Sequence, residues 1–297
     1  MILKSLLIFL LAAELNFFSV PDVVFHDEQS ETVAAPYRID TANVGVEISS
    51  KRAIAVDVAS GRVLFAKDPS AAQSIASITK LMTAIVVLEQ NPDWKMQIEM
   101  LKQDETVGAA PHVNRGEKVA FYDLWKAALI SSDNNSVMAM IRALGIENGR
   151  FVKMMNDKAH VLGLVNTKFS DPTGLDAGNM SSAGDVARLL HYALKQNGIR
   201  EMVLQPSYEF KILNKNKPRK IFNTDVLLSS FLNKKSYGYE LIGGKTGYTI
   251  EAGYCLAVEL SMAGREIIIV VLDGDSIDAR FNDAKVLADW IFFNYKW

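Results

Sequence analysis

Apolar and polar residues alternate in two short runs from residue 52 onward, and apolar residues then recur at helical spacing. Residues 52–58 and 62–66 alternate around the turn Ala59-Ser60-Gly61, which predicts a β-hairpin. The next apolar run begins at Ile75 and predicts a helix that ends before Pro92, because proline cannot continue a helix. The same spacing predicts further helices at about residues 122–130, 137–144, 147–162 and 182–195.

Strand patterns return after Pro206. We predict strands at residues 208–213, 239–242, 254–260 and 267–272, a basic solvated loop at residues 214–220, and a final amphipathic helix at residues 278–295. Strands at both ends of the chain with helices between them predict an α/β fold of the α+β type. In this fold, an antiparallel sheet of about five strands is flanked by helices and joined to an all-helical block.

The first residues have the pattern of a targeting segment. Lys4 precedes an apolar run at residues 6–13 that is too short to span a bilayer but adequate as the core of a signal peptide. Phe17 and Phe18 extend the apolar character, so residues 1–20 are predicted to be either a signal peptide or an uncleaved anchor that associates with the membrane. Residues 21–50 are predicted to be a linker or extended arm, and residues 51–297 the catalytic domain.

Composition narrows the function classes. The 297 residues are 49% hydrophobic, which suffices for a substantial core. The 32 Lys and Arg and the 34 Asp and Glu residues give a net charge of −2, which offers no support for nucleic-acid binding. The single cysteine, Cys255, is predicted to be a buried structural thiol. The 4 histidines lack metal-ligand spacing, and neither a metal nor another cofactor is predicted.

Ser77 and Lys80 form the first chemical motif. Residues three apart on a helix share one face, so the Lys80 amine can reach the Ser77 hydroxyl. An amine can deprotonate a serine only when the amine is neutral, which requires burial or a nearby second cation. Ser77 also lies at the predicted N-terminus of its helix, where backbone N–H groups favour an oxyanion. The pattern indicates a nucleophile beside a base, although so short a pattern also arises by chance.

Two further motifs have both a chemical and a plainer interpretation. Ser132-Asp133-Asn134 lies on a predicted loop between helices, where the serine can relay a proton and the asparagine can bind an amide; the alternative is a helix-capping loop. Lys245-Thr246-Gly247 lies between two strand-like runs. A phosphate-binding loop would need a glycine at Tyr239 and a helix after the motif, so nucleotide binding is discounted.

The order Ser-x-x-Lys, Ser-Asp-Asn, Lys-Thr-Gly, with each motif present once, resembles penicillin-binding proteins and class A β-lactamases. Segments 75–83, 169–175 and 243–249 make the chain similar to the low-molecular-mass penicillin-binding proteins of the serine D-Ala-D-Ala carboxypeptidase and endopeptidase family, from about residue 52 to the C-terminus. The resemblance implies the penicillin-binding protein/β-lactamase-like transpeptidase fold. It also implies peptidoglycan stem peptides as substrates, β-lactam antibiotics as covalent inhibitors, and export to the periplasmic or cell-wall side of the inner membrane.

The resemblance implies roles for three catalytic side chains. Ser77 would be the acylated nucleophile, Lys80 its base, and Ser132 the group that passes a proton to the leaving amine. Lys245 would help to keep Lys80 neutral by repulsion between like charges.

It also implies a set of substrate-binding groups. Asn134 would hold the substrate amide, while Lys245, Thr246 and Gly247 would bind the substrate, with the first two at its terminal carboxylate. The backbone N–H groups of Ser77 and Tyr248 would form the oxyanion hole.

Two alternatives remain, a class A-like β-lactamase and a catalytically idle cell-wall binding module. A β-lactamase of this kind needs a glutamate-held water between the second and third motifs, and residues 168–176 contain no glutamate. All the expected side chains are present, which argues against an idle module. Several family members carry a further β-rich domain, whereas about one helix follows the last predicted strand here. The chain therefore resembles the shorter branch, the D-alanyl-D-alanine endopeptidases.

Overall fold

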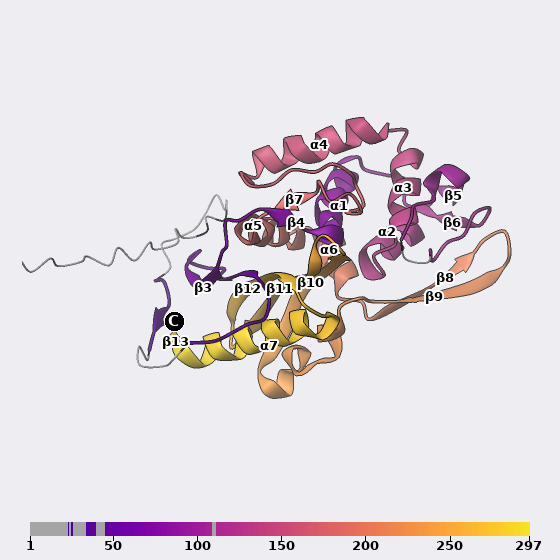
Figure 1. Ribbon diagram of the computed structural model, residues 1–297. Helices are drawn as coiled ribbons and strands as arrows, with labels where there is room; N and C mark the ends of the chain where they lie inside the picture. Colours follow the sequence, from indigo (N-terminus) through magenta and orange to yellow (C-terminus); the bar gives the residue numbers. More distant parts are fainter. Residues whose placement is uncertain (1–22, 24, 26–33, 40–44, 109–110) are drawn as a thin grey trace, which may run out of the picture.

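The computed structural model describes residues 23, 25, 34–39, 45–108 and 111–297, which form a sheet layer and a helical block (Figure 1). The predicted targeting segment, residues 1–20, lies outside the described residues, and so does much of the predicted arm. The arm residues that are described contact the folded domain. Ser49 and Ser50 donate hydrogen bonds to Asp283, and strand β1 (Tyr37–Arg38) pairs with strand β13 (Tyr295–Lys296).

The central sheet has five antiparallel strands, which confirms the predicted fold class. Their order across the sheet is β10 (Tyr239–Thr249), β11 (Gly253–Met262), β12 (Arg265–Gly274), β2 (Arg52–Asp57) and β3 (Val63–Lys67). The first hairpin of the chain therefore joins the C-terminal strands, as predicted.

Alternate residues of the central strands enter two separate apolar clusters. Ile268 and Val270 pack in the cluster that contains helix α5, whereas Ile267 and Ile269 pack in the cluster that contains helix α7. Because successive strand side chains point to opposite faces, the sheet is buried on both sides. This arrangement explains why residues 267–272 of β12 are a continuous apolar run. Cys255 is buried here, as expected, and burial raises the pKa of its thiol to about 12.

Seven helices are found among the described residues, all close to predicted positions except the short α6. They are α1 (Lys80–Glu89), α2 (Phe121–Ile130), α3 (Asn134–Ala143), α4 (Asn148–Val161), α5 (Ala183–Leu194), α6 (Asn197–Val203) and α7 (Ile277–Asn294). Short 3-10 helices are η1 (Ala76–Thr79), η2 (Lys102–Asp104), η3 (Val226–Ser229), η4 (Phe231–Asn233) and η5 (Lys235–Tyr237). In this part of the chain, no helix has both the length and the apolar character needed to cross a bilayer.

The helical block also contains three two-stranded pairs, of which the sequence predicted only the strand at residues 208–213. They are β4 (Gln73–Ser74) with β7 (Met180–Ser181), β5 (Gln97–Glu99) with β6 (Lys118–Ala120), and β8 (Ser207–Ile212) with β9 (Lys217–Phe222). The prediction of a solvated basic loop at residues 214–220 is wrong for most of its length. The charged side chains concealed the strand pattern in which Ile221 is buried and Arg219 is partly buried.

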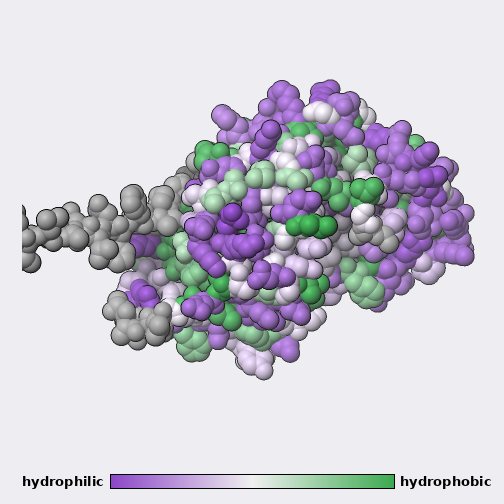
Figure 2. Space-filling model, in the orientation of Figure 1, coloured by the Kyte–Doolittle hydropathy of each residue, from purple (hydrophilic) through white to green (hydrophobic). Residues whose placement is uncertain are grey.

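The β8–β9 hairpin projects from the helical block beside β5 and β6 (Figure 1). Hydrophilic residues cover most of the surface at this end of the molecule (Figure 2).

Candidate active site

Ser77 lies in the 3-10 turn η1, and Lys80 is the first residue of α1. The Lys80 Nζ donates a hydrogen bond to Ser77 Oγ over 2.9 Å, and Lys80 is only 1% exposed. The α-helix begins at Lys80 and not at Ile75 as predicted, yet the contact between Ser77 and Lys80 survives because residues i and i+3 eclipse one another in a 3-10 turn. Ala76, just before the serine, has a positive φ of 47°, a sparsely populated conformation for a residue with a side chain.

Lys80 is surrounded by acceptors as well as by apolar atoms. Its Nζ also donates to Asn134 Oδ1 over 2.6 Å and to the Thr173 carbonyl over 2.7 Å. Burial lowers the pKa of Lys80 to about 7, although the negative charges of Asp133 and Asp171 act to raise it. Burial by itself therefore accounts for a lysine that can be neutral near pH 7.

Ser132 and Asn134 lie at the turn between α2 and α3. Ser132 has a φ of 61°, and its Oγ accepts a hydrogen bond from Lys245 Nζ over 2.9 Å. Asp133 between them caps α3 by accepting from the Ser136 backbone N–H over 2.7 Å. The capping interpretation is confirmed for Asp133, and its two neighbours, Ser132 and Asn134, contact the buried lysines.

The third motif lies within β10, not between two strands as predicted. Lys245 is 2% exposed and also donates to the Thr246 carbonyl over 3.1 Å. Burial, followed by the positive charges of Lys80 and Arg280, lowers the pKa of Lys245 well below its ordinary value. The predicted effect was on Lys80, yet burial, Asp133 and Asp171 set the pKa of Lys80, and the repulsion between the two amines lowers the pKa of Lys245 instead. The Thr246 hydroxyl shares a hydrogen bond of 2.6 Å with the Thr224 hydroxyl.

Two glycines allow backbone to approach the nucleophile turn. A Cβ on Gly247 would lie 2.7 Å from the Ile75 carbonyl oxygen and 3.2 Å from the Ser77 nitrogen. A Cβ on Gly174 would lie 2.1 Å from the Ala76 carbonyl oxygen, and the φ of this glycine is +89°. Side chains at these positions would push β10 and the loop after Pro172 away from Ser77.

The three motifs meet in one cavity of about 600 Å³. Ser77, Ser132, Asn134, Thr246, Gly247 and Tyr248 line it, together with Gly108, Ser131, Gly174, Leu175, Thr224, Thr249, Ile250, Glu251 and Arg280. Tyr248 is half-exposed and stacks on Tyr254 with ring centroids 4.3 Å apart. A second cavity of about 630 Å³, lined by Trp94, Tyr122 and Trp125 among others, contains no residue of the three motifs.

Arg280 is a site residue that the sequence interpretation missed. It is 5% exposed, lines the cavity, and donates through Nη1 to the Gly247 carbonyl over 3.0 Å. Its Nε has no hydrogen-bond partner among the described residues. The signal was present in the sequence, since Arg280 occupies the same helix face as the buried residues Ala284 and Leu287.

Asp171 is a second missed residue, and it shapes the loop that supplies the Thr173 carbonyl. Its carboxylate accepts from the Thr173 N–H over 3.0 Å, from the Gly174 N–H over 2.9 Å, and from the Asn179 side chain. Across the described ranges of the chain, no three His, Cys, Asp or Glu side chains come together in a way that could hold a metal ion.

Known proteins match both the sequence and the fold. The profile of the family described as D-alanyl-D-alanine carboxypeptidase matches residues 37–276. The D-alanyl-D-alanine endopeptidase of Pseudomonas aeruginosa is 33% identical over 247 residues, which are 82% of this chain and 78% of the relative.

Two solved structures extend the likeness to three dimensions. A Streptomyces DD-transpeptidase is 28% identical with a TM-score of 0.74, covering 83% of this chain and 98% of its own. A penicillin-binding protein of Listeria monocytogenes in its cefotaxime-bound form is 27% identical with a TM-score of 0.72, and the match covers 84% of this chain and 99% of that protein's chain. The predicted family resemblance and fold are confirmed: the chain belongs to the D-alanyl-D-alanine carboxypeptidase family of serine peptidases.

Proposed function

We propose that Ser77 of this D,D-peptidase attacks the D-Ala carbonyl of peptidoglycan stem peptides and forms an acyl-enzyme, with Lys80 as the base. The observation that carries the proposal is the buried Lys80 amine, 2.9 Å from the Ser77 hydroxyl, with a pKa of about 7. An amine with this pKa is partly neutral at physiological pH, close to the value that suits a general base.

In the acylation step, the neutral Lys80 amine takes the Ser77 proton as Oγ bonds to the carbonyl carbon. The carbonyl oxygen becomes an oxyanion, which the backbone N–H groups of Ser77 and Tyr248 would stabilise. The closeness of Gly247 to the Ser77 nitrogen supports this pairing, because Tyr248 is the next residue of β10. The carbon–nitrogen bond then breaks as Ser132 gives its proton to the leaving nitrogen and takes the proton that Lys80 carried from Ser77, which returns Lys80 to the neutral amine. Water later hydrolyses the ester, again with Lys80 as the base.

Asn134 would bind the substrate amide through its Nδ2. Its Oδ1 already accepts from Lys80, so the side chain has its donor free to bind the carbonyl of the acyl part.

The terminal carboxylate of the substrate would bind at Lys245 and Thr246, with Arg280 behind the Gly247 peptide. A carboxylate arriving there would raise the lowered pKa of Lys245, since an opposite charge favours the ammonium form. Substrate binding and protonation of Lys245 would thus be coupled, and the positive charge would be present when the substrate needs it.

The loop between the second and third motifs favours a peptidase over a β-lactamase. Residues 168–176 contain no glutamate, and the carboxylate of Asp171 is occupied by hydrogen bonds within its own loop. The other carboxylate of this stretch, Asp176, likewise accepts from a neighbouring backbone N–H, that of Gly178, over 2.7 Å. The loop therefore has no glutamate to hold a water that would hydrolyse a penicilloyl ester, and the adduct should last.

The substrate class sets the location that we propose for the protein. Peptidoglycan lies outside the cytoplasmic membrane, so the chain would act after export, on the periplasmic or cell-wall side of the inner membrane. The relative named endopeptidase, together with a cavity open along Tyr248, Ile250 and Glu251, supports cross-linked stem peptides as substrates beside free pentapeptide.

We expect benzylpenicillin to acylate Ser77 and to remain attached. The β-lactam amide opens at the same carbonyl position as a D-Ala amide, while its leaving group stays tethered and shields the ester. Intact-mass and peptide-mass analysis should show one adduct on Ser77, none in Ser77→Ala, and an unchanged adduct in the exposed control Ser70→Ala. An adduct elsewhere would contradict the site, and rapid multiple-turnover hydrolysis would establish the β-lactamase alternative.

The acylation rate should rise with pH through about 7, the pKa of Lys80. Below that pH the amine is protonated, and the rate should fall about tenfold per pH unit; above it the rate should level off. Lys80→Arg should be inactive, because a guanidinium stays protonated, whereas the exposed control Lys95→Arg should keep the wild-type profile. A flat profile from pH 5.5 to 8.5, or an arginine variant that acylates at near the wild-type rate, would show that Lys80 is not the base.

Cross-linked muropeptide dimers should be cleaved at a rate comparable to or above that for free pentapeptide. Both substrates place a carboxylate beside the scissile amide, so Lys245 and Thr246 can bind either, and the open cavity leaves room for the larger leaving group. Separate incubation with each muropeptide, followed by chromatography of the products, measures the two rates. Release of free D-Ala with intact dimers would leave a carboxypeptidase alone.

A further inference from the structure

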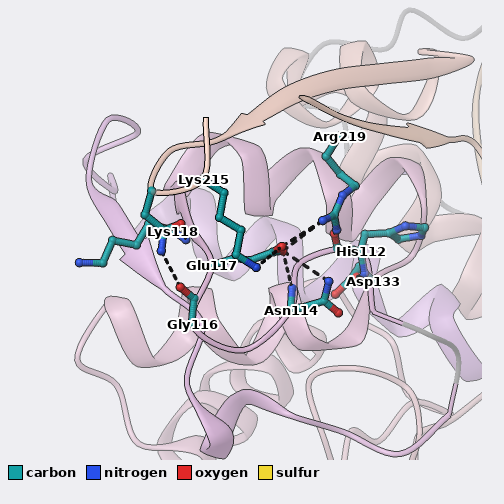
Figure 3. A network of polar contacts seen from close by, with 9 residues as sticks. His112, Asn114, Gly116, Glu117, Lys118, Asp133, Lys215 and Arg219 are labelled. Atoms are coloured by element: carbon teal, nitrogen blue, oxygen red, sulfur yellow. Dashed lines mark hydrogen bonds and ion pairs between the residues drawn. The ribbon is translucent and has the colours of Figure 1, made fainter. Parts of the chain in front are cut away.

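A buried carboxylate joins the β8–β9 hairpin to the loop that precedes β6. Glu117 is 3% exposed and accepts from the Asn114 backbone N–H over 2.9 Å (Figure 3). Arg219 Nη2, from β9, lies 3.1 and 3.3 Å from the two carboxylate oxygens, and Lys215 Nζ lies 3.1 Å from one of them. A carboxylate this deeply buried is stable as an anion only with such partners, so the hairpin is fixed in place by charge.

Backbone contacts fix the same hairpin in register. Asn214 at the hairpin turn accepts from the Lys118 N–H over 3.0 Å and donates to the Gly116 carbonyl over 2.7 Å. The Leu213 N–H donates to the Lys118 carbonyl over 2.7 Å. The hairpin and residues 114–118 therefore form one hydrogen-bonded unit.

This unit reaches the turn that carries Ser132 and Asn134. Arg219 donates through Nη1 to the His112 carbonyl, and the His112 N–H donates to Asp133 Oδ2 over 2.5 Å (Figure 3). The other Asp133 oxygen caps α3. His112 thus connects the hairpin to Asp133. Its carbonyl binds Arg219, and its N–H binds the aspartate that lies between Ser132 and Asn134.

The end of the hairpin also contacts the opposite wall of the cavity. Two residues after β9, the Thr224 N–H donates to the Ile130 carbonyl at the end of α2, and the Thr224 hydroxyl meets that of Thr246. One continuous segment therefore contacts both the α2–α3 turn and β10.

We propose that Arg219 and Glu117 are positioning residues, which hold Ser132 and Asn134 against Lys245 and Lys80 through His112 and Asp133. The inference rests on the proposed function, in which Ser132 protonates the leaving nitrogen. A displaced Ser132 would slow that proton transfer. Arg219 can contact both Glu117 and His112 because its planar guanidinium presents several donors, whereas a lysine amine at this position would reach one of them.

The variant Arg219→Lys tests the proposal with two substrates that share the same acyl group and differ in the leaving group. One is an N-acyl-D-Ala-D-Ala peptide, and the other is the thioester in which sulfur replaces the scissile nitrogen. A thiolate leaves without a proton, so a displaced Ser132 should slow the peptide far more than the thioester. Arg115→Lys is the matched control, since Arg115 lies in the loop that carries Glu117 but is 55% exposed and pairs only with the exposed Glu105 among the described residues.

In Arg219→Lys we expect kcat/KM to fall about tenfold for the peptide and less than about threefold for the thioester, because small misplacements of catalytic groups are costly. Arg115→Lys should match the wild type with both. Glu117→Gln should reproduce the selective loss while keeping the shape of the side chain, and it serves if Arg219→Lys fails to fold.

Three outcomes separate the possible failures. An equal fall in kcat/KM for both substrates, proportional to the fall in the folded fraction measured by circular dichroism, would mean that the network has only a structural role. That result would overturn the proposal. Rates in both variants equal to those of Arg115→Lys would overturn it as well. A wild-type enzyme that turns over neither substrate would instead refute the proposed function.

Discussion

Two lysine side chains, Lys80 and Lys245, are buried in one site, and the chemistry depends on the cost of charging them there. Each amine would be charged at neutral pH in water, but removing an ammonium from water is expensive unless opposite charge compensates it. Burial therefore lowers the pKa of both, and the charge of Lys80 lowers that of Lys245 further. In the proposed mechanism, Lys80 would then serve as the base, and Lys245 would become a cation when a carboxylate binds.

The fold brings these lysines together from three separate elements. Lys80 begins α1, Lys245 lies within β10, and the α2–α3 turn places Ser132 and Asn134 as hydrogen-bond partners of the two amines. Close approach requires small residues, which is why Gly174 and Gly247 lie against the nucleophile turn. The five-stranded sheet holds β10 rigidly, since β10 pairs with β11 along its whole length apart from one register shift.

Sequence reasoning identified most residues of this site because they belong to three short motifs in a fixed order along the chain. The spacing of Ser77 and Lys80 predicted their contact even though the turn is 3-10 and not α-helical, since both geometries place residues three apart on one face. The sheet followed from alternating apolar runs. Arg280 and Asp171 were missed because their roles depend on what packs against them: a helix residue 33 positions beyond Gly247 contacts its carbonyl. The β9 strand was missed because charged residues dominate it, and the carboxylate that binds its Arg219, that of Glu117, lies 102 residues earlier.

The charge state of Lys80 is therefore the quantity to measure. Lysine labelled with ¹³C at Cε gives NMR signals that follow each amine through its titration, and the Lys80 signal is identified by its absence from Lys80→Arg. We expect its midpoint near pH 7, well below the ordinary lysine value of 10.5. A Lys80 midpoint above about 9 would mean that the amine is an ammonium ion at neutral pH, and it would contradict a neutral lysine base beside Ser77.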